Sequence, residues 1–576
     1  MLSPARSVMR SRILLMISYA VLAAAGAARA DTALFLSSQW ADRGTTTPGH
    51  PLQGVSVSLF GGSTDASNTL LATGTFGSGG TVTLSTPTTD VDGSNVLHSY
   101  AVISASIPGV ATAYDAAGAG GNIFTLQTPE NYTLINTTSP APFPISNIND
   151  ASKMMQAVQL IGFINNYYKS APFNATLPPI RINYNPANAG SSMGGGIMTL
   201  GYSDWGNIDV LFHEYGHDIA ENNNLDYRPG SGEEHGFGQD QIGTLNGGGG
   251  FGPTAGSRLA WQEGIATYLG MTAIVDGGLS TAIPGLPPDD SSPTGFRYYD
   301  SYLPAPAATT INAGDLSFAV SINSRYLTTS TNTGNNGGSY TTFQLNGRGE
   351  GDEMSIMRCL NSFYSSAGVQ TYSRNQDYAN LGAAKVFSLM KAAGTAGDAN
   401  VGTFYGFWRK LTPDVIANKG EVGLGAGDSN AKAVAYLGST LEEYGISEIP
   451  LTSGTIDQTQ AKFQWTEQNN NNSQFYKLLI YSSDWSTLVY DSGQLGDPTP
   501  TTLSNVNFTI PFGAISAGTY NYVVINDPAM ALQADLNASN FNWYWSGPQT
   551  ITIVPEPATL SLMALAGAGL LLRRRR

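Results

Sequence analysis

The chain has a single cysteine, few charged residues and very few histidines. One cysteine in 576 residues excludes an intrachain disulfide, so stability has to come from interior packing and from bound ions. Charged residues make up only 12%, and the excess of acidic over basic residues gives a net charge of −15. This negative charge disfavours nucleic acid as a partner, because phosphates would be repelled. The acidity is compatible with structural Ca²⁺, at positions that the sequence does not locate.

Length and composition are those of an exported protein with several domains. A chain of 576 residues is too long for one hydrophobic core and predicts about three or four domains. The 67 glycines and 30 prolines are more typical of a loop-rich extracellular protein than of a cytosolic enzyme.

Both ends of the chain carry segments that are typical of export. Residues 1–30 read as a cleavable signal peptide, in which arginines precede an apolar run and Ala28-Arg29-Ala30 offers a cleavage site. At the other end, Val554-Pro555-Glu556-Pro557 precedes a mostly apolar run and four arginines. Residues 554–576 therefore resemble the PEP-CTERM sorting signal of Gram-negative, exopolysaccharide-producing bacteria. The resemblance implies export and processing at the envelope, with only transient membrane contact through this tail. A plain transmembrane anchor is the alternative.

Alternating apolar and polar residues predict two all-β modules. Residues 31–140 contain short strands, such as 55–60 and 100–105, and resemble transthyretin-like or Cna-B-like sandwiches. The sequence leaves open whether this module acts as a pro-segment. Alternation returns over residues 450–553, which resemble a fibronectin type III or other immunoglobulin-like sandwich. The run Trp543-Tyr544-Trp545 is expected in its core rather than in a sugar-binding platform.

The stretch between these modules, residues 146–448, carries the motif with chemical meaning. Helical periodicity is expected over residues 147–168, 350–364, 383–393, 401–411 and 431–444. A further helix contains His213, Glu214 and His217 at the spacing His-Glu-x-x-His. Residues four apart share one helix face, so the two imidazoles are expected to converge on one ion. Zinc lowers the pKa of its bound water, and an adjacent carboxylate takes the proton as water attacks a carbonyl. A chance match on an amphipathic helix is the competing interpretation.

The residues around this motif resemble a known class of enzyme. The segment Ile197-Met198-Thr199-Leu200-Gly201, followed by the helix that starts near Asp209, is similar to the corresponding stretch of thermolysin-like and fungalysin-like zinc peptidases. The resemblance implies an α+β zincin domain in which His213 and His217 bind Zn²⁺ and Glu214 is the general base. It also implies that the strand 197–201 holds an extended peptide along a free edge.

The third metal ligand defines the subclass. A histidine six residues after the second one, as in metzincins, is excluded because Asn223 occupies that position. The segment from Trp261 to Tyr268 resembles the Glu-Gly-x-Ala-x-Tyr pattern of glutamate-type zincins, which makes Glu263 the expected ligand. Thr267 stands four residues later, where those enzymes often have an acidic residue.

Other residues remain open as site members. Glu234 and His235 lie in a glycine-rich insertion between the two helices and are rival third ligands. Peptidases of this class need a donor beside the attacked carbonyl, and His235 or Arg348 is a candidate for that role.

These observations predict a multidomain protein, with an α+β zincin catalytic domain flanked by all-β immunoglobulin-like sandwich modules. The predicted activity is that of a secreted zinc endopeptidase acting on a protein or peptide, located at the cell envelope or outside the cell. The predicted catalytic residue is Glu214, and the predicted metal ligands are His213, His217 and Glu263. The alternative is an envelope or matrix adhesion protein with a degenerate zincin domain, whose β-modules bind a polymer such as the exopolysaccharide of a biofilm matrix.

Overall fold

The protein is a mixture of helices and several β-sheets in more than one compact part. The computed structural model describes residues 32–40, 49–62, 68–86, 98–115, 121–129, 143–145, 150–187, 190–202, 204–205, 208–226, 253–283, 297–301, 316–321, 332–333, 339–340, 349–364, 379–394, 402–466, 475–496, 505–528 and 541–555, with a few residues between 563 and 570. The chain divides into two compact units, Met1–Gln159 and Leu160–Arg576. The predicted signal peptide lies outside the described residues.

The first unit is built mainly from short strands. Its strands are β1 (Thr32–Trp40), β2 (His50–Pro51), β3 (Ser56–Gly62), β4 (Thr69–Thr75), β5 (Thr81–Thr86), β6 (His98–Ser104), β7 (Ser106–Ile107), β8 (Ala111–Tyr114), β9 (Thr125–Gln127) and β10 (Phe143–Ile145). The order β4-β3-β6-β9 forms an antiparallel sheet, and β1 pairs with β2, β5 and β10. Buried Val57 and Ile103 alternate with more exposed neighbours, as expected for strands with one face in a core. The strands predicted near 55–60 and 100–105 are thus confirmed.

The second unit begins with the elements that position the candidate site. They are α2 (Asp150–Lys169, which starts in the first unit), β11 (Ile180–Asn185), β12 (Ser192–Gly194), β13 (Ile197–Gly201), α3 (Ile208–Asn222), α4 (Pro253–Asp276) and α5 (Leu279–Ala282). Two antiparallel strand pairs follow, β14 (Arg297–Ser301) with β15 (Leu316–Ser321) and β16 (Asn332–Thr333) with β17 (Ser339–Tyr340). The later helices are η3 (Gly349–Gly351), α6 (Glu353–Tyr364), α7 (Ala383–Ala393), α8 (Phe404–Ala417), η5 (Lys419–Val422) and α9 (Asn430–Glu443). The helices predicted from periodicity are therefore present, with ends shifted by a few residues.

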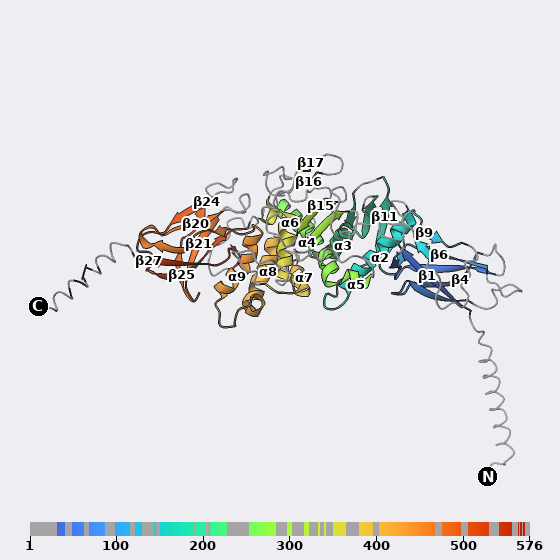
Figure 1. Ribbon diagram of the computed structural model, residues 1–576, viewed down its shortest axis with the longest axis horizontal. Coiled ribbons are helices and arrows are strands. Elements are labelled where there is room, and N and C mark those ends of the chain that lie inside the picture. Colours follow the sequence, from blue (N-terminus) through green and yellow to red (C-terminus); the bar gives the residue numbers. More distant parts are fainter. Residues whose placement is uncertain are drawn as a thin grey trace, which may run out of the picture. The chain divides into compact units, whose positions relative to one another are not determined.

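Helix α4 packs against both α3 and α6 (Figure 1). Glycines allow the close approach in both helix pairs. A Cβ atom at Gly216 of α3 would lie 2.3 Å from the carbonyl oxygen of Ala266 on α4. A Cβ atom at Gly264 of α4 would lie 2.8 Å from the carbonyl oxygen of Glu353, where α6 begins. Any larger residue at either position would push the helices apart. Backbone therefore meets backbone on both sides of the segment that contains Glu263.

The last part of the second unit is a pair of packed sheets. Its elements are β18 (Ile449–Pro450), β19 (Gly454–Asp457), η6 (Gln458–Gln460), β20 (Lys462–Thr466), β21 (Phe475–Ser482), β22 (Leu488–Asp491), β23 (Leu495–Gly496), β24 (Asn505–Thr509), β25 (Gly518–Asn526), β26 (Tyr544–Trp545) and β27 (Gln549–Val554). One sheet has the order β18-β20-β24 and the other has β19-β27-β25-β21-β22. Phe463 and Trp465 of the first sheet pack against Ile480, Tyr522 and Val524 of the second in one apolar core. Trp543, Tyr544 and Trp545 are all buried, as predicted, but they lie outside this apolar core, and Tyr544 packs against aromatic rings of α8.

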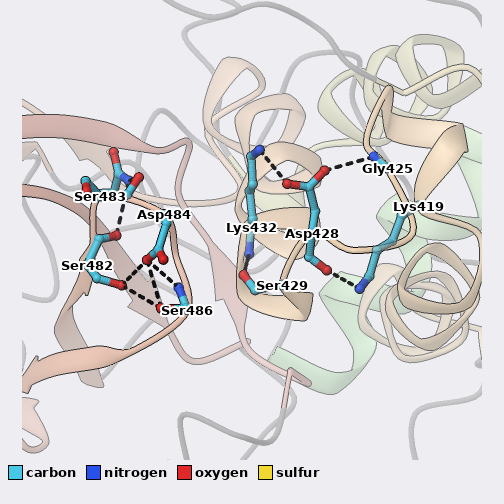
Figure 2. A network of polar contacts seen from close by, with 10 residues as sticks. Lys419, Gly425, Asp428, Ser429, Lys432, Ser482, Ser483, Asp484 and Ser486 are labelled. Carbon is cyan, nitrogen blue, oxygen red and sulfur yellow. Dashed lines mark hydrogen bonds and ion pairs between the residues drawn. The ribbon is translucent and has the colours of Figure 1, made fainter.

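Two small polar networks fix turns in this unit (Figure 2). The Asp428 carboxylate, ahead of α9, accepts from Lys432 Nζ and from Gly425 N, each at 2.8 Å. Lys432 is the main cause of the lowered pKa of Asp428. In the β21–β22 turn, Asp484 Oδ1 accepts from the Ser482 hydroxyl at 2.6 Å. This hydrogen bond, with others from Ser486, lowers the pKa of Asp484 to about 2. Both carboxylates therefore serve local turns.

The glycine contact between α3 and α4 generates a stability prediction. Gly216→Ala is expected to lower the free energy of unfolding by about 1–3 kcal/mol, because the overpacking cost exceeds the gain of about 1 kcal/mol from replacing a helical glycine. Chemical denaturation of the purified protein measures this difference. Gly420→Ala is the control, because a Cβ atom there would meet nothing within 4 Å. Equal stability of the two variants would contradict the assigned role of Gly216.

Candidate metal centre

Helix α3 supplies three of the four predicted site residues. Its residues from Leu211 to Ala220 are all buried, including the polar ones. His213 is 8% exposed, His217 is 6% exposed and Glu214 is 8% exposed. At about 100° per residue, Glu214 lies about 100° from His213 and about 60° from His217 around the helix axis. The three polar side chains therefore leave neighbouring sides of a helix that is otherwise in the protein interior.

Helix α4 supplies the fourth residue and crosses close to α3. Trp261, Ile265 and Leu269 are fully buried and hold α4 in the core, and Glu263 is 5% exposed. The Gly216–Ala266 contact lies within one turn of both α3 histidines and within one turn of Glu263. This approach brings the carboxylate within reach of both imidazoles.

The ligand atoms of these residues form a nearly equilateral triangle. Glu263 Oε2 lies 3.2 Å from His213 Nε2 and 3.2 Å from His217 Nε2. The two Nε2 atoms are also 3.2 Å apart. A tetrahedral zinc ion with bonds of about 2.0–2.1 Å requires ligand atoms about 3.3–3.4 Å apart. Three donors at these distances match one face of that tetrahedron. Within the described residues this is the one group of three or more His, Cys, Asp or Glu side chains close enough to share an ion.

The hydrogen bond of His213 favours metal binding through its other nitrogen. His213 Nδ1 lies 2.8 Å from the hydroxyl oxygen of Thr267 on α4, and both groups are buried. With the proton on Nδ1 donated to this oxygen, the lone pair of Nε2 points into the triangle. The two imidazole rings stand almost perpendicular, at 86°, with centroids 4.7 Å apart. Three acceptor atoms that face one another repel unless a proton or a cation lies among them, and one cation satisfies all three together.

Thr267 is the residue whose role the sequence did not reveal. In the sequence, Thr267 stands out only as a departure from the acidic residue that glutamate-type zincins often have four positions after the ligand. The signal was nevertheless present, because residues four apart on a helix share a face and Glu263 was the predicted ligand. A hydroxyl can accept the Nδ1 proton as a carboxylate does, but without a negative charge.

The sequence also offered rival third ligands and candidates for the donor beside the attacked carbonyl. Glu234, His235 and Arg348 lie outside the described residues. Glu263 therefore stays the predicted third ligand on the strength of its distances to the two histidines.

The prediction that the strand 197–201 has a free edge is wrong. This segment is a strand, β13, but β11 pairs with it in parallel on one side and β12 pairs with it antiparallel on the other. Among the described strands, β12 is the outermost on this side of the sheet, and it contacts α3. Gly195 N, just after β12, donates to Glu221 Oε2 near the end of α3 at 3.3 Å. The terminal described strand beside the histidine helix in this sheet is therefore β12.

The contact between Thr267 and His213 generates a prediction about the affinity for Zn²⁺. Thr267→Val is expected to weaken Zn²⁺ binding about 10- to 100-fold, because His213 loses the partner that fixes its proton. Thr267→Ser should retain most of the affinity. Competition against a chromogenic chelator measures both. Thr272→Val is the matched control, because that hydroxyl donates to Tyr268 O at 2.8 Å on the same helix. Equal zinc affinities of Thr267→Val and the control would refute this role.

Comparison with known families identifies the end of the chain. Residues 554–576 match the PEP-CTERM protein-sorting motif. Proteins with this motif are exported and then anchored or sorted, so the protein is directed to the cell envelope or the extracellular space. No curated protein matches the chain. In the described part of the chain, no helix is long and apolar enough to cross a membrane.

Proposed function

We propose that this exported protein is a zinc-dependent endopeptidase of the glutamate-type zincin class. The observation that carries the proposal is the triangle of His213, His217 and Glu263, with three edges of 3.2 Å. Two imidazoles and one carboxylate are a donor set that zinc prefers, and three protein ligands are the number found at catalytic sites. The resemblance of the segments 197–222 and 261–268 to thermolysin-like and fungalysin-like enzymes supports the same class.

The proposed fold follows from this assignment. Residues 146–448 would form the α+β zincin domain, and residues 31–140 and 450–553 would form immunoglobulin-like sandwich modules on either side of it in the sequence. Helices α3 and α4 would then carry the ligands, and the sheet that contains β12 and β13 would lie beside the site. The packed sheets of residues 449–554 support the sandwich assignment at the C-terminal end.

The residues present can perform peptide hydrolysis if zinc is bound. A zinc ion held by the three ligands would polarise the peptide carbonyl and lower the pKa of a water molecule. Glu214 would accept the proton of that water and pass it to the amide nitrogen that leaves. Its position next to His213 on a buried helix keeps the carboxylate near the site and limits access of bulk water. Thr267 would fix the orientation of the His213 ring, and the negative charge of Glu263 would partly balance the charge of the ion.

The outer side of β12, the terminal described strand of its sheet, is the proposed place for the substrate backbone. An extended peptide can add to the edge of a sheet through main-chain hydrogen bonds, which are independent of side-chain identity. β12 contacts the histidine helix α3, so a peptide bound there would lie along the same helix as Glu214. The substrate class that this arrangement favours is an unfolded or extended protein segment.

Removing the proposed base should separate catalysis from metal binding. Glu214→Gln is expected to lower kcat for casein hydrolysis by about 10²- to 10⁴-fold, because the amide cannot accept the proton. Bound zinc, measured by elemental analysis, should stay near one per chain. Glu221→Gln is the control on the same helix, since its amide oxygen can still accept from Gly195 N. Casein hydrolysis that survives Glu214→Gln would exclude the mechanism.

Removing a proposed ligand should abolish both activity and metal. In His213→Ala, the triangle loses one corner and the zinc content is expected to fall well below one per chain. A chelator should inactivate the wild-type protein, and added Zn²⁺ should restore it. A wild-type chain that binds no zinc would instead favour the adhesion function with a degenerate zincin domain.

A further inference from the structure

The segment around β26 is buried among the helices of the second unit as well as in its own sheet. Its backbone pairs with β25, where Tyr544 faces Asn526 and Trp545 faces Ile525. Trp408 Nε1 of α8 donates to Trp543 O at 2.7 Å. On the α9 side, Gly547 N donates to Glu442 Oε2 at 3.0 Å. The close approach of α9 depends on Gly438, where a Cβ atom would lie 2.3 Å from Trp545 O.

Tyr544 connects this segment to α8 and to η3. Its ring contacts those of Phe404, Tyr405 and Trp408 on α8, with centroids 5.9–6.2 Å apart. Its hydroxyl donates to Glu350 Oε2 at 2.6 Å, and both residues are 0% exposed. A hydrogen bond from a phenol to a buried carboxylate is among the stronger kinds. Tyr544 therefore helps to hold η3, to which Glu350 belongs, in position.

Two chains of contact lead from Tyr544 to the residues on either side of Glu263. In the first, η3 packs on α4 and leads at once into α6, whose first carbonyl, that of Glu353, lies against Gly264. In the second, the Phe404 ring contacts both Tyr544, at 6.0 Å, and Trp261, at 6.3 Å. Trp261 precedes Glu263 by two residues, and Gly264 follows it directly. Trp261 and Gly264, on either side of Glu263, are thus both connected to Tyr544 through intermediate contacts.

We infer that Tyr544, in β26, is a positioning residue for the proposed metal ligand Glu263. The inference rests on the proposed function, since it assigns to the C-terminal sheets a part in building that site. The segment around β26 then helps to build the metal site, so the sandwich of residues 450–553 is more than an attached binding module. The site reaches its ligand geometry only when β26 has folded into place. A chain that stops before β26 would carry all four motif residues and still bind zinc weakly.

Tyr544→Phe in the full chain tests the inference. The variant keeps the ring but loses the hydrogen bond to Glu350, and its Kd for Zn²⁺ is expected to rise about 2- to 30-fold, the range typical of residues that act through intermediate contacts. Competition with a chromogenic chelator gives the Kd, and casein hydrolysis gives kcat and KM. The main loss should be in zinc affinity and kcat, with KM nearly unchanged.

Tyr522→Phe is the matched control for a general loss of stability. Tyr522 is also 0% exposed, lies in the same sheets, and donates its hydroxyl to Thr452 O at 2.7 Å. It has the same chemistry but does not contact η3 through a hydrogen bond. Its removal should lower the melting temperature and leave zinc affinity within about twofold of wild type, a difference below about 0.5 kcal/mol.

The outcomes separate the inference from the proposed function. A wild-type chain without zinc affinity would overturn both. A wild type that binds zinc, with Tyr544→Phe equal to wild type or no weaker than Tyr522→Phe, would overturn the inference alone. Glu350→Gln provides a second variant, because its amide oxygen still accepts from Tyr544. It should bind zinc more tightly than Tyr544→Phe, and the reverse order would contradict the role of this hydrogen bond.

Discussion

The backbone contact between α3 and α4 at Gly216 is the constraint on which the candidate site depends. Two imidazoles on one helix converge by helical geometry alone, but a carboxylate from a second helix reaches them only if the two axes come close. A side chain at position 216 would collide with Ala266 O. Glu263 Oε2 can therefore reach the two histidines only because this position is a glycine. In these buried surroundings, three facing acceptors repel one another unless a proton or a cation lies among them. The packing of α3 and α4 thus supplies the ligand geometry that the proposed metal site needs.

The chemical motif could be predicted from the sequence because it depends on local geometry. Because His213 and His217 are four residues apart, they share one face of a helix. The pattern around Glu263 predicts a second helix that carries the third ligand. The edge strand could not be predicted. β12 has only three residues, Ser192–Gly194, in a glycine-rich segment without alternation, so the longer β13 took its place in the prediction. Short strands carry too few residues for a period of two to be visible.

Contacts between distant segments were also beyond the sequence. Alternation and aromatic content predicted that Tyr544 would be buried, which is confirmed, but burial does not identify the covering element. Its hydroxyl pairs with Glu350, 194 residues earlier. Neither residue belongs to a motif, and a buried glutamate at the start of a helix usually suggests only a favourable interaction with the helix dipole. Such pairs follow from the tertiary arrangement, which local patterns do not encode.

The sorting motif begins where β27 ends, so the sheet limits where the tail could be cut without damage to a strand. β27 continues to Val554, and the motif covers residues 554–576. β27 is an interior strand, because β19 pairs with its residues Ile551–Val554 and β25 pairs with Gln549–Ile553. Only three residues separate it from β26. A cut within β27 would remove hydrogen bonds from both neighbours and loosen the strand that carries Tyr544. Processing that preserves the proposed metal site must therefore act beyond Val554, on the proline-containing segment that follows the sheet.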